Sequence, residues 1–498
     1  MRTKERIPII CKDLRGYDLL HEGTLALSDI EENGLRIDIK RVEKEIKNTD
    51  NKIKEIIEKL NGYKEIETWK RIFGKKFNLF SNKQLSELLF QHLKIKSKGV
   101  TEKGNHKTDE TTLKKLKIPF VKDILELRKL NKSGNTYLQN FIREQWEGII
   151  HPSFNLHLVK TFRSSSQNPN FQNIPVRQEE MKKLIRSCII PRKDHLLVEI
   201  DYKALEVRIA TCYHKDPNMI DEIVNPARDM HRDMAMEIYK LKPNEWTELA
   251  RYYAKNKFVF PEFYGDYYES CAKNLWEPVT ANTLVTLSGE PMRDHLKKVG
   301  IQNYNDFEDH LKKVEDRFWN VRFPVYTEWK KKQIEKYYRN GFITMHTGFR
   351  CSGLMKRNEV INYPVQGAAF HCLLWSVIHL NKIFKKLKMD SMIVGQIHDS
   401  MILDVHPEEY NKVLNLAYQV MTEEIRKVWE WIIVPLDIEI EVSIMNRSWY
   451  EKKKVIRKEC PVCKAMYVYK NKPKEDTKKI IWECPLCGDK TEEYKEVI

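Results

Sequence analysis

The stretch VGQIHDSMILDV, residues 394–405, places a His-Asp pair between two apolar runs. This pattern predicts two short strands joined by a tight turn, with Asp399 at or near the turn. A carboxylate within an apolar hairpin costs free energy unless a cation lies beside it. The hairpin therefore predicts a cation-binding aspartate.

A second aspartate occupies a matching position upstream. In LLVEIDYKALEVRIATC, residues 196–212, an apolar strand leads to Asp201 and a helix follows. Two aspartates on neighbouring strands can hold two hard cations roughly 3.5–4 Å apart, an arrangement suited to phosphoryl transfer. Each aspartate could instead only cap a turn or a helix, because Asp is common at such positions.

Length, composition and charge narrow the classes of protein. The chain has 498 residues, of which 41% are hydrophobic and 32% charged, enough for roughly three or four folded domains. The net charge of +16 favours a polyanionic partner, either nucleic acid or an anionic membrane. No stretch of 18 or more apolar residues exists, and the run IPII near the start is too short for a signal peptide. A nucleic-acid partner is therefore favoured, and no membrane is expected.

A basic and aromatic segment lies between the two aspartates. In RYYAKNKFVFPEFYG, Arg251 and Lys255 are four residues apart, so a helix places them on one face, and several aromatic residues follow. Such a face could grip a triphosphate and stack a base. An amphipathic helix with a solvated basic edge is the alternative explanation.

Four of the ten cysteines form a spaced set near the C-terminus. CPVC at 460–463 and CPLC at 484–487 are separated by 20 residues, which predicts a tetrahedral thiolate zinc site in a zinc ribbon. The other six cysteines are scattered and indicate reduced thiols inside a cell, so two disulfides are less favoured. One structural Zn²⁺ is expected, held by Cys460, Cys463, Cys484 and Cys487.

Taken together, the segments resemble the signature motifs of family A DNA polymerases, the bacterial DNA polymerase I type. DYKALEVRIA and QIHDSMILDV resemble its two palm motifs, and RYYAKNKFVFPEFYG resembles its fingers helix. RSSSQNPNFQNIPVR, RDMHRDMAMEIY and NYPVQGAAF match further motifs, and FNLFSNKQLSELLF and ILELRKLNKSGNTYL resemble its thumb. The similarity covers roughly residues 20–450, with the motifs in the order of the family.

The resemblance implies an α+β fold shaped like a right hand. An antiparallel palm sheet carries both aspartates, between helical fingers and a helical thumb, and the small zinc ribbon is appended. The expected division is residues 1–40 as N-terminal tail and start of the palm, 41–150 as thumb, 151–225 as palm, 226–345 as fingers, 346–450 as palm, and 451–498 as a charged linker, EKKKVIRK, followed by the ribbon.

The resemblance also implies roles for individual residues in template-directed DNA synthesis. Asp201 and Asp399 would be the catalytic carboxylates that hold two Mg²⁺ ions, with the Tyr202 carbonyl as an additional ligand. The primer 3′-hydroxyl would attack the α-phosphate of a deoxynucleoside triphosphate, and pyrophosphate would leave.

Further residues would bind the substrates. Glu206 would press on the 2′ side of the sugar and exclude ribonucleotides. Residues that contact the triphosphate or the nascent pair would be His231, Arg251, Lys255 and Tyr264. Residues that contact primer-template DNA would be Arg163 and Gln366 in the minor groove and His398 at the primer end.

The fingers helix departs from the family pattern. Lys255 and Tyr264 are nine residues apart, where the family has eight, and Pro261 lies within the helix. A kink or π-bulge is therefore expected near 257–261. The aromatic residue that faces the sugar is expected to be Phe260, with Val259 as the alternative from strict spacing. Phenylalanine there would imply discrimination against dideoxynucleotides.

A second departure leaves two alternatives open. Ser400 follows His-Asp, where the family usually has Glu; single-subunit phage-type RNA polymerases carry His-Asp-Ser at that point. Glu206 argues against an RNA polymerase, because a bulky acid beside the 2′ position would reject ribonucleotides. A non-catalytic DNA-binding relative is the other alternative, but such a protein need not keep both aspartates.

The remaining expectations concern organisation and partners. Only about 20 residues precede the palm-like start, and domains rarely fall below about 50 residues, so no proofreading exonuclease is expected in this chain. A separate exonuclease or a replication protein docked on the ribbon are candidate partners. The lean chain is typical of a phage or mobile element, and the expected location is the cytoplasm, that of the host if the source is viral.

Overall fold

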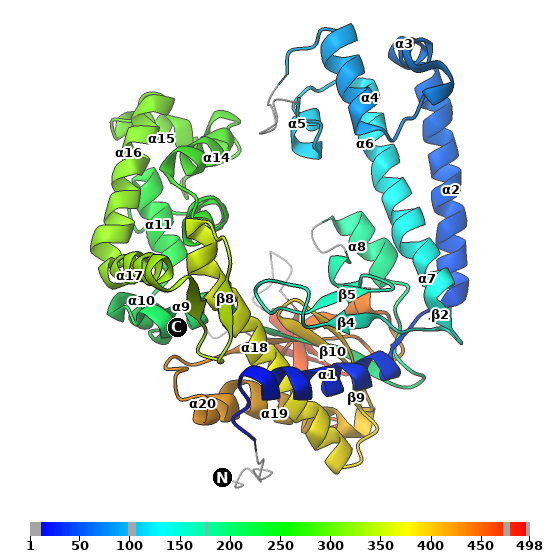
Figure 1. The fold of residues 1–498 in the computed structure, drawn as a ribbon, viewed down its shortest axis with the longest axis vertical. Coiled ribbons are helices and arrows are strands. Elements are labelled where there is room, and N and C mark those ends of the chain that lie inside the picture. Colours follow the sequence, from blue (N-terminus) through cyan, green and yellow to red (C-terminus); the bar gives the residue numbers. More distant parts are fainter. Residues whose placement is uncertain (1–10, 98–105, 175–177, 472–478, 495–498) are drawn as a thin grey trace.

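A computed structural model describes residues 11–97, 106–174, 178–471 and 479–494 of the chain. Two groups of helices rise on either side of a central sheet, as the predicted right hand requires (Figure 1). We call the sheet with its covering helices the palm, the column built on residues 39–144 the thumb, and the column of residues 217–340 the fingers. In the part of the chain that the structure describes, no helix is long and apolar enough to cross a membrane.

The palm sheet has eight antiparallel strands in the order β15-β14-β13-β12-β11-β6-β10-β9. Ser400 pairs with Ile397, so His398 and Asp399 form the predicted turn, and His398 has a φ of 48°. The strands are β6 (Leu196–Tyr202), β9 (Met392–Ile397), β10 (Ser400–Val405), β11 (Ile438–Val442), β12 (Lys453–Arg457), β13 (Tyr467–Asn471), β14 (Lys479–Glu483) and β15 (Lys490–Tyr494).

Helices pack against one face of this sheet and close the main core. The sequence of residues 363–388 predicts a long buried helix, and this helix is α18 (Arg357–Lys386), whose residues from Gly367 to Asn381 are all buried. Gly23 on the N-terminal helix lies so close to α18 that an added Cβ would be 2.9 Å from Leu374. The covering elements are α1 (Gly16–Asn33), α18, α19 (Tyr410–Tyr418), the π-helical turn η8 (Gln419–Glu424) and α20 (Ile425–Val428).

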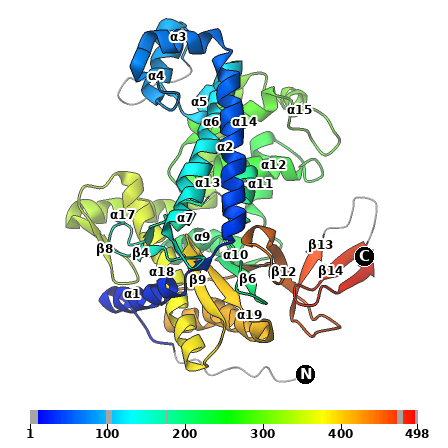
Figure 2. The same cartoon turned by 90° about the vertical axis from the view of Figure 1, so that its right-hand side faces the viewer.

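The thumb is a pair of long helices with a small helical tip (Figures 1 and 2). The helical period of residues 41–62, with many Lys and Glu, predicts a long exposed helix, which is α2; its long partner is interrupted by the π-helical segment η3. The basic, turn-rich sequence of residues 92–118 predicts a loop with helices around it, and part of this stretch lies outside the described residues. The elements are α2 (Ile39–Asn61), α3 (Lys64–Phe73), η1 (Gly74–Lys76), α4 (Asn82–Glu87), η2 (Leu88–His92), α5 (Glu110–Lys114), α6 (Pro119–Asn131), η3 (Lys132–Leu138) and α7 (Gln139–Glu144).

The fingers form a second core of their own. The extra residue of the fingers helix is absorbed by a π-helical turn, η5, directly before Pro261, which confirms the predicted irregularity. The elements are α10 (Pro217–Val224), α11 (Met230–Tyr239), α12 (Glu248–Ala254), η5 (Lys255–Val259), α13 (Phe260–Phe263), α14 (Tyr268–Thr280), α15 (Met292–Lys298), α16 (Tyr304–Arg317), η6 (Phe318–Arg322) and α17 (Pro324–Asn340).

Short elements join the palm to its two columns. Strand β6 passes directly into α9, as predicted for residues 196–212. The joining elements are β1 (Leu35–Arg36), β2 (Gln145–Trp146), β3 (Ile149–Ile150), β4 (Ser153–Asn155), β5 (Ser165–Gln167), η4 (Phe171–Asn173), α8 (Glu179–Arg186), α9 (Leu205–His214), β7 (Phe342–Thr344), β8 (Arg350–Ser352), η7 (Pro407–Glu409) and η9 (Trp449–Glu451).

The C-terminal segment differs from the sequence interpretation. The stretch expected as a charged linker, residues 451–458, contains strand β12, which pairs with β11 through Lys454 and Glu441. Its lysines have carboxylate partners on the neighbouring strand, since Lys454 Nζ lies 2.6 Å from Glu439 Oε2. The C-terminal module therefore continues the palm sheet (Figure 2).

Hydrogen bonds also join this module to the palm helices. The Tyr410 hydroxyl on α19 donates to the Tyr467 carbonyl at 3.1 Å, and the Tyr469 hydroxyl donates to the Val442 carbonyl at 2.7 Å. Both tyrosines of β13 are buried within the main core of the palm. We therefore expect the palm and the module to unfold together.

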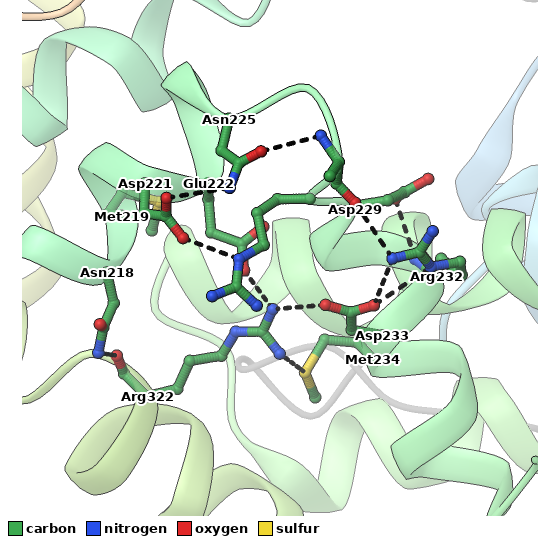
Figure 3. Close-up of polar contacts among 12 residues, drawn as sticks. Asn218, Met219, Asp221, Glu222, Asn225, Asp229, Arg232, Asp233, Met234 and Arg322 are labelled. Atoms are coloured by element: carbon green, nitrogen blue, oxygen red, sulfur yellow. Dashed lines mark hydrogen bonds and ion pairs between the residues drawn. The ribbon is translucent and has the colours of Figure 1, made fainter. Parts of the chain in front are cut away.

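A network of ion pairs holds the base of the fingers (Figure 3). Arg322 contacts Glu222 of α10 and lies 3.2 Å from Asp233 of α11. Arg232 also reaches Asp233, at 3.2 Å. Because Glu222 is only 7% exposed, its charge depends on the guanidinium, so Arg322 fixes α10 and α11 against the end of η6.

Replacing Arg322 tests this network. In Arg322→Ala the buried Glu222 loses its cation, and we expect a destabilisation of about 3–5 kcal/mol in thermal or urea denaturation. The matched control is Arg317→Ala: Arg317 and its partner Glu237 are 46% and 30% exposed, so about 0–1 kcal/mol is expected. Equal effects of the two substitutions would contradict the assignment, and Glu222→Gln should restore much of the loss in Arg322→Ala.

Candidate active site

Two aspartates meet at the centre of the palm sheet. Asp201 on β6 pairs directly with Ser400 on β10, the residue after Asp399. The backbone N–H of Tyr202 donates to the Asp399 carbonyl at 3.4 Å. Both carboxylates line a cavity of about 610 Å³ between the palm and the fingers. The two aspartates thus lie beside each other, Asp201 on β6 and Asp399 in the turn that leads into the paired strand β10.

The end of β6 is anchored by Tyr202. Its buried hydroxyl lies 2.9 Å from Ser376 Oγ of α18 and donates to the Met421 carbonyl at 3.0 Å. Two residues later, Ala204 has a φ of 49° and turns the chain into α9. This fixed end holds Asp201 at the floor of the cavity.

The charges at this floor are unbalanced. Desolvation, together with the neighbouring carboxylates of Asp399 and Glu199, raises the pKa of Asp201 to about 7. Desolvation also raises the pKa of Asp399, against an opposing effect of the Arg163 guanidinium. A divalent cation between the carboxylates would relieve both penalties, and carboxylate oxygens are the donors that Mg²⁺ prefers. The donor set therefore fits the predicted magnesium.

Glu206 joins three walls of the cavity. It lies in the first turn of α9, accepts a hydrogen bond from the Tyr264 hydroxyl at the end of the fingers helix, and pairs with Arg163. Arg163 Nε also donates to the Gln366 carbonyl of α18 at 3.3 Å. The structure thus brings together four of the residues predicted to surround the sugar and the nascent pair.

A glycine permits this close approach. An added Cβ at Gly367 would lie 2.4 Å from the Thr161 carbonyl. Any larger residue would therefore separate α18 from the segment that carries Arg163, and would move Gln366 away from it.

The fingers contribute an aromatic wall. Phe260 lines the cavity, whereas Val259, the strict-spacing alternative, is fully buried in the fingers core. The ring of Phe260 packs edge-on against His231 at 5.8 Å, and Lys255 Nζ lies 5.2 Å from its centroid. The π-helical turn therefore gives the position facing the cavity to Phe260.

Three predicted phosphate-binding residues lie behind this wall rather than in the cavity. They are His231, Arg251 and Lys255. Arg251 Nε donates to Asp229 Oδ2 at 2.8 Å. Burial, with the cationic Lys255 and Arg251, lowers the pKa of His231 to about 4. Its buried Nδ1 has no hydrogen-bond partner among the described residues. The other nine predicted polymerase-site residues all line the cavity.

The turn that carries His398 is held by amides. Gln396 Nε2 donates to the His398 carbonyl at 2.6 Å, and its Oε1 accepts from Ser164 Oγ at 2.7 Å and from Gln172 Nε2 at 3.0 Å. His398 itself is exposed at the cavity edge.

Sequence reasoning missed several residues of this site. Asn362 lines the cavity, and its side-chain amide donates to the Tyr264 carbonyl at 3.4 Å. His214 and Tyr326 also line it and stack with ring centroids 4.1 Å apart. Asn362 is the first residue of the quoted motif NYPVQGAAF and could have been found from it. The pairing of His214 with Tyr326 depends on the tertiary fold.

The four spaced cysteines also come together. Their sulfur atoms all lie within 4.8 Å of one another, with Cys460 and Cys487 at 3.7 Å and Cys463 and Cys484 at 3.4 Å. Sulfurs 2.3 Å from a tetrahedral zinc are about 3.8 Å apart. The residue that follows each CxxC pair, Lys464 or Gly488, has a positive φ. This geometry fits the predicted zinc.

Comparison with known proteins places the chain in a family. Residues 43–451 match the family described as DNA polymerase family A. The chain belongs to DNA polymerase family A. This family A chain is 29% identical over 384 residues to DNA polymerase I of Lactococcus lactis subsp. lactis, a match that covers 76% of the chain and 40% of the relative. It is 27% identical over 419 residues to the DNA polymerase of Bacillus phage SP01, covering 79% and 42%.

A solved structure shares the fold. It is the polymerase domain of Pol1 from M. smegmatis, solved in complex with DNA primer-template and dNTP. The two structures superimpose with a TM-score of 0.67 at 21% sequence identity, and the match covers 87% of this family A chain and 70% of that structure. This similarity confirms the predicted α+β fold shaped like a right hand. The chain spans less than half the length of the curated relatives that it matches.

The raised pKa of Asp201 predicts that the folding stability of this family A chain falls as the pH rises. The folded pKa of about 7 exceeds the ordinary value of 3.8, so stability from the bound proton is lost as the pH rises from about 4 to about 7. Asp201→Asn mimics the protonated form. In the absence of metal we expect it to melt about 1–3 °C above the parent at pH 8, and by less at pH 5.

Thermal scans with and without Mg²⁺ check this prediction. Magnesium should raise the melting temperature of the parent protein at pH 8 and leave Asp201→Asn nearly unchanged. A variant less stable than the parent at pH 8 would contradict the proposed repulsion among the carboxylates.

Proposed function

We propose that this chain is a template-directed DNA polymerase that adds deoxynucleotides to a primer 3′ end. The observation that carries the proposal is the placement of Asp201 and Asp399 on paired strands at the floor of a cavity whose opposite wall is the fingers helix. Membership of DNA polymerase family A supports it.

In this proposal the palm carries the chemistry. Two Mg²⁺ ions held by Asp201, Asp399 and the Tyr202 carbonyl would activate the primer 3′-hydroxyl and neutralise charge on the leaving pyrophosphate. The buried Tyr202 side chain keeps the end of β6 rigid, so the carboxylates need little rearrangement when substrate binds.

The fingers and the sheet edge would select and orient the substrates. Glu206 and Phe260 would face the sugar, with Tyr264 beside the nascent pair. Rotation of the fingers helix would release Arg251 from Asp229 and bring it, with Lys255 and His231, to the phosphates. In the arrangement seen here, burial and the cationic Lys255 and Arg251 lower the pKa of His231 to about 4. The rotation would remove that burial and turn its ring nitrogens to the phosphates. Phe260 predicts poor use of dideoxynucleotides.

The remaining parts would bind DNA. Arg163 and Gln366 would contact the minor groove of the new pair, and His398 would position the primer end. We propose the thumb (41–150) as the element that holds the duplex, opposite the fingers (226–345), with the palm divided between 151–225 and 346–450. A replication partner, a separate exonuclease and a cytoplasmic location stay predictions.

Primer extension tests the proposal directly. With a primed single-stranded template and Mg²⁺, we expect extension with deoxynucleotides and not with ribonucleotides. Asp399→Asn should lower the rate roughly 10²–10³-fold without changing primer-template binding by a comparable factor. Glu206→Ala should increase the use of ribonucleotides by roughly tenfold or more, since it removes the group beside the 2′ position.

Other outcomes separate the alternatives. Extension by the parent protein with ribonucleotides would support an RNA polymerase. No extension with either substrate, in a folded preparation that binds primer-template, would support a non-catalytic relative. The neutral control is His157→Ala, an exposed residue outside the cavity, which should behave as the parent.

We further propose that the four cysteines hold one structural Zn²⁺. Cys463→Ser should remove the metal, as measured by elemental analysis, and lower the melting temperature by about 5 °C or more, because the module shares the core of the palm. The control Cys11→Ser, outside the cluster, should retain one zinc per chain. A metal-free parent protein that melts like the zinc-bound form would contradict this proposal.

A further inference from the structure

A third carboxylate lies on the catalytic face of the palm sheet. Glu199 precedes Asp201 by two residues on β6, so both side chains project from the same face. The strand register continues this face onto the next two strands. Glu441 of β11 lies opposite Glu199, and Lys454 of β12 lies opposite Glu441. Glu199 also reaches across to β10, where its Oε1 accepts from Ser400 Oγ at 3.4 Å.

Glu199 is the centre of a nearly buried cluster of charges. Its Oε2 accepts from Trp449 Nε1 at 2.7 Å and lies 3.8 Å from the Arg186 guanidinium. Lys452 pairs with both Glu199 and Glu441. The side chains of Lys452 and Arg186 are only 7% and 4% exposed. Two cations and two carboxylates therefore balance within this cluster.

The Lys452 ammonium is close enough to Asp201 to affect it. Lys452 lowers the pKa of Asp201, whereas Asp399, Glu199 and Glu439 raise it. The lysine stem is flexible, and the next carboxylate along the face from Glu199 is Asp201. Within the described residues, the Lys452 ammonium pairs with Glu199 and Glu441 and lies 5.8 Å from the centroid of the Trp449 ring. These contacts direct it away from the proposed metal site.

We propose that Glu199 is a positioning residue that keeps Lys452 off Asp201 and so preserves Asp201 for divalent metal. This inference rests on the proposed function only for the role of the metal. Without the Glu199 charge, Lys452 keeps one carboxylate partner, Glu441, whose side chain is 35% exposed. The ammonium then also interacts with Asp201, and metal must displace it before binding. The polymerase then needs more Mg²⁺ but reaches the same rate once Mg²⁺ saturates.

The test is a magnesium titration of primer extension by Glu199→Gln, which is isosteric. We expect the half-saturating Mg²⁺ concentration to rise roughly tenfold, the equivalent of about one pKa unit of competing interaction, with the saturated rate within about twofold of the parent. The double variant Glu199→Gln with Lys452→Met should return the requirement to near the parent value, because the competing cation is gone.

Two controls separate charge from structure. Glu439→Gln removes a carboxylate opposite Asp201, but its partner Lys454 is 52% exposed and stays hydrated, so little change is expected. Glu199→Asp keeps the charge and should keep a near-parent magnesium requirement. An equal rise in Glu199→Asp and Glu199→Gln, or no rescue by Lys452→Met, would overturn the proposal.

A binding readout separates this inference from the proposed function. The rise in melting temperature on addition of Mg²⁺ is measured for the parent, Glu199→Gln and the double variant, without DNA or nucleotide. The half-effect concentration should shift upward in Glu199→Gln and return in the double variant, even if the parent extended no primer. Identical magnesium dependence in all three proteins would overturn the proposal.

Discussion

The pairing of β6 with β10 is the constraint on which the rest of the molecule depends. It places Asp201 and Asp399 at adjacent positions, although like charges and desolvation disfavour both ionised forms. The free energy that offsets this repulsion comes from apolar residues of the same strands, such as Ile200 and Met401, which are fully buried. Packing of the strands therefore fixes the positions of the two carboxylates before any ligand binds.

Packing and ion pairs also fix the side chains that form the walls of the cavity. The π-helical turn η5 rotates the fingers helix so that Val259 packs in the core while Phe260 faces the cavity. Glu206 gathers Tyr264 and Arg163 from two other segments. Of the basic groups proposed for the triphosphate, Arg251 is held by Asp229 and the Lys255 ammonium lies over the Phe260 ring.

Local patterns were sufficient for much of this arrangement, and tertiary partners account for what they missed. The apolar runs on either side of Asp399 predicted the hairpin, and Pro261 within the fingers helix, with its one extra residue, predicted the π-helical turn. Each of these signals lies within a few residues of sequence. The sequence favoured Phe260 and kept Val259 as the alternative, because one residue of helical phase separates them; the structure turns Phe260 to the cavity and buries Val259. Strand β12 was taken for a linker because its lysines find carboxylates on other strands, Lys454 on β11 and Lys453 on β14. No local pattern shows these partners.

The charges around Lys452 connect the C-terminal module to the catalytic face. Buried ion pairs contribute less to stability than to the choice of one arrangement over another. Glu199 and Glu441, from two strands, converge on Lys452 directly before β12 begins. A slip of β12 by one residue would move Lys452 away from these carboxylates. The register that attaches the module to the palm is therefore also the register that keeps the Lys452 ammonium away from Asp201.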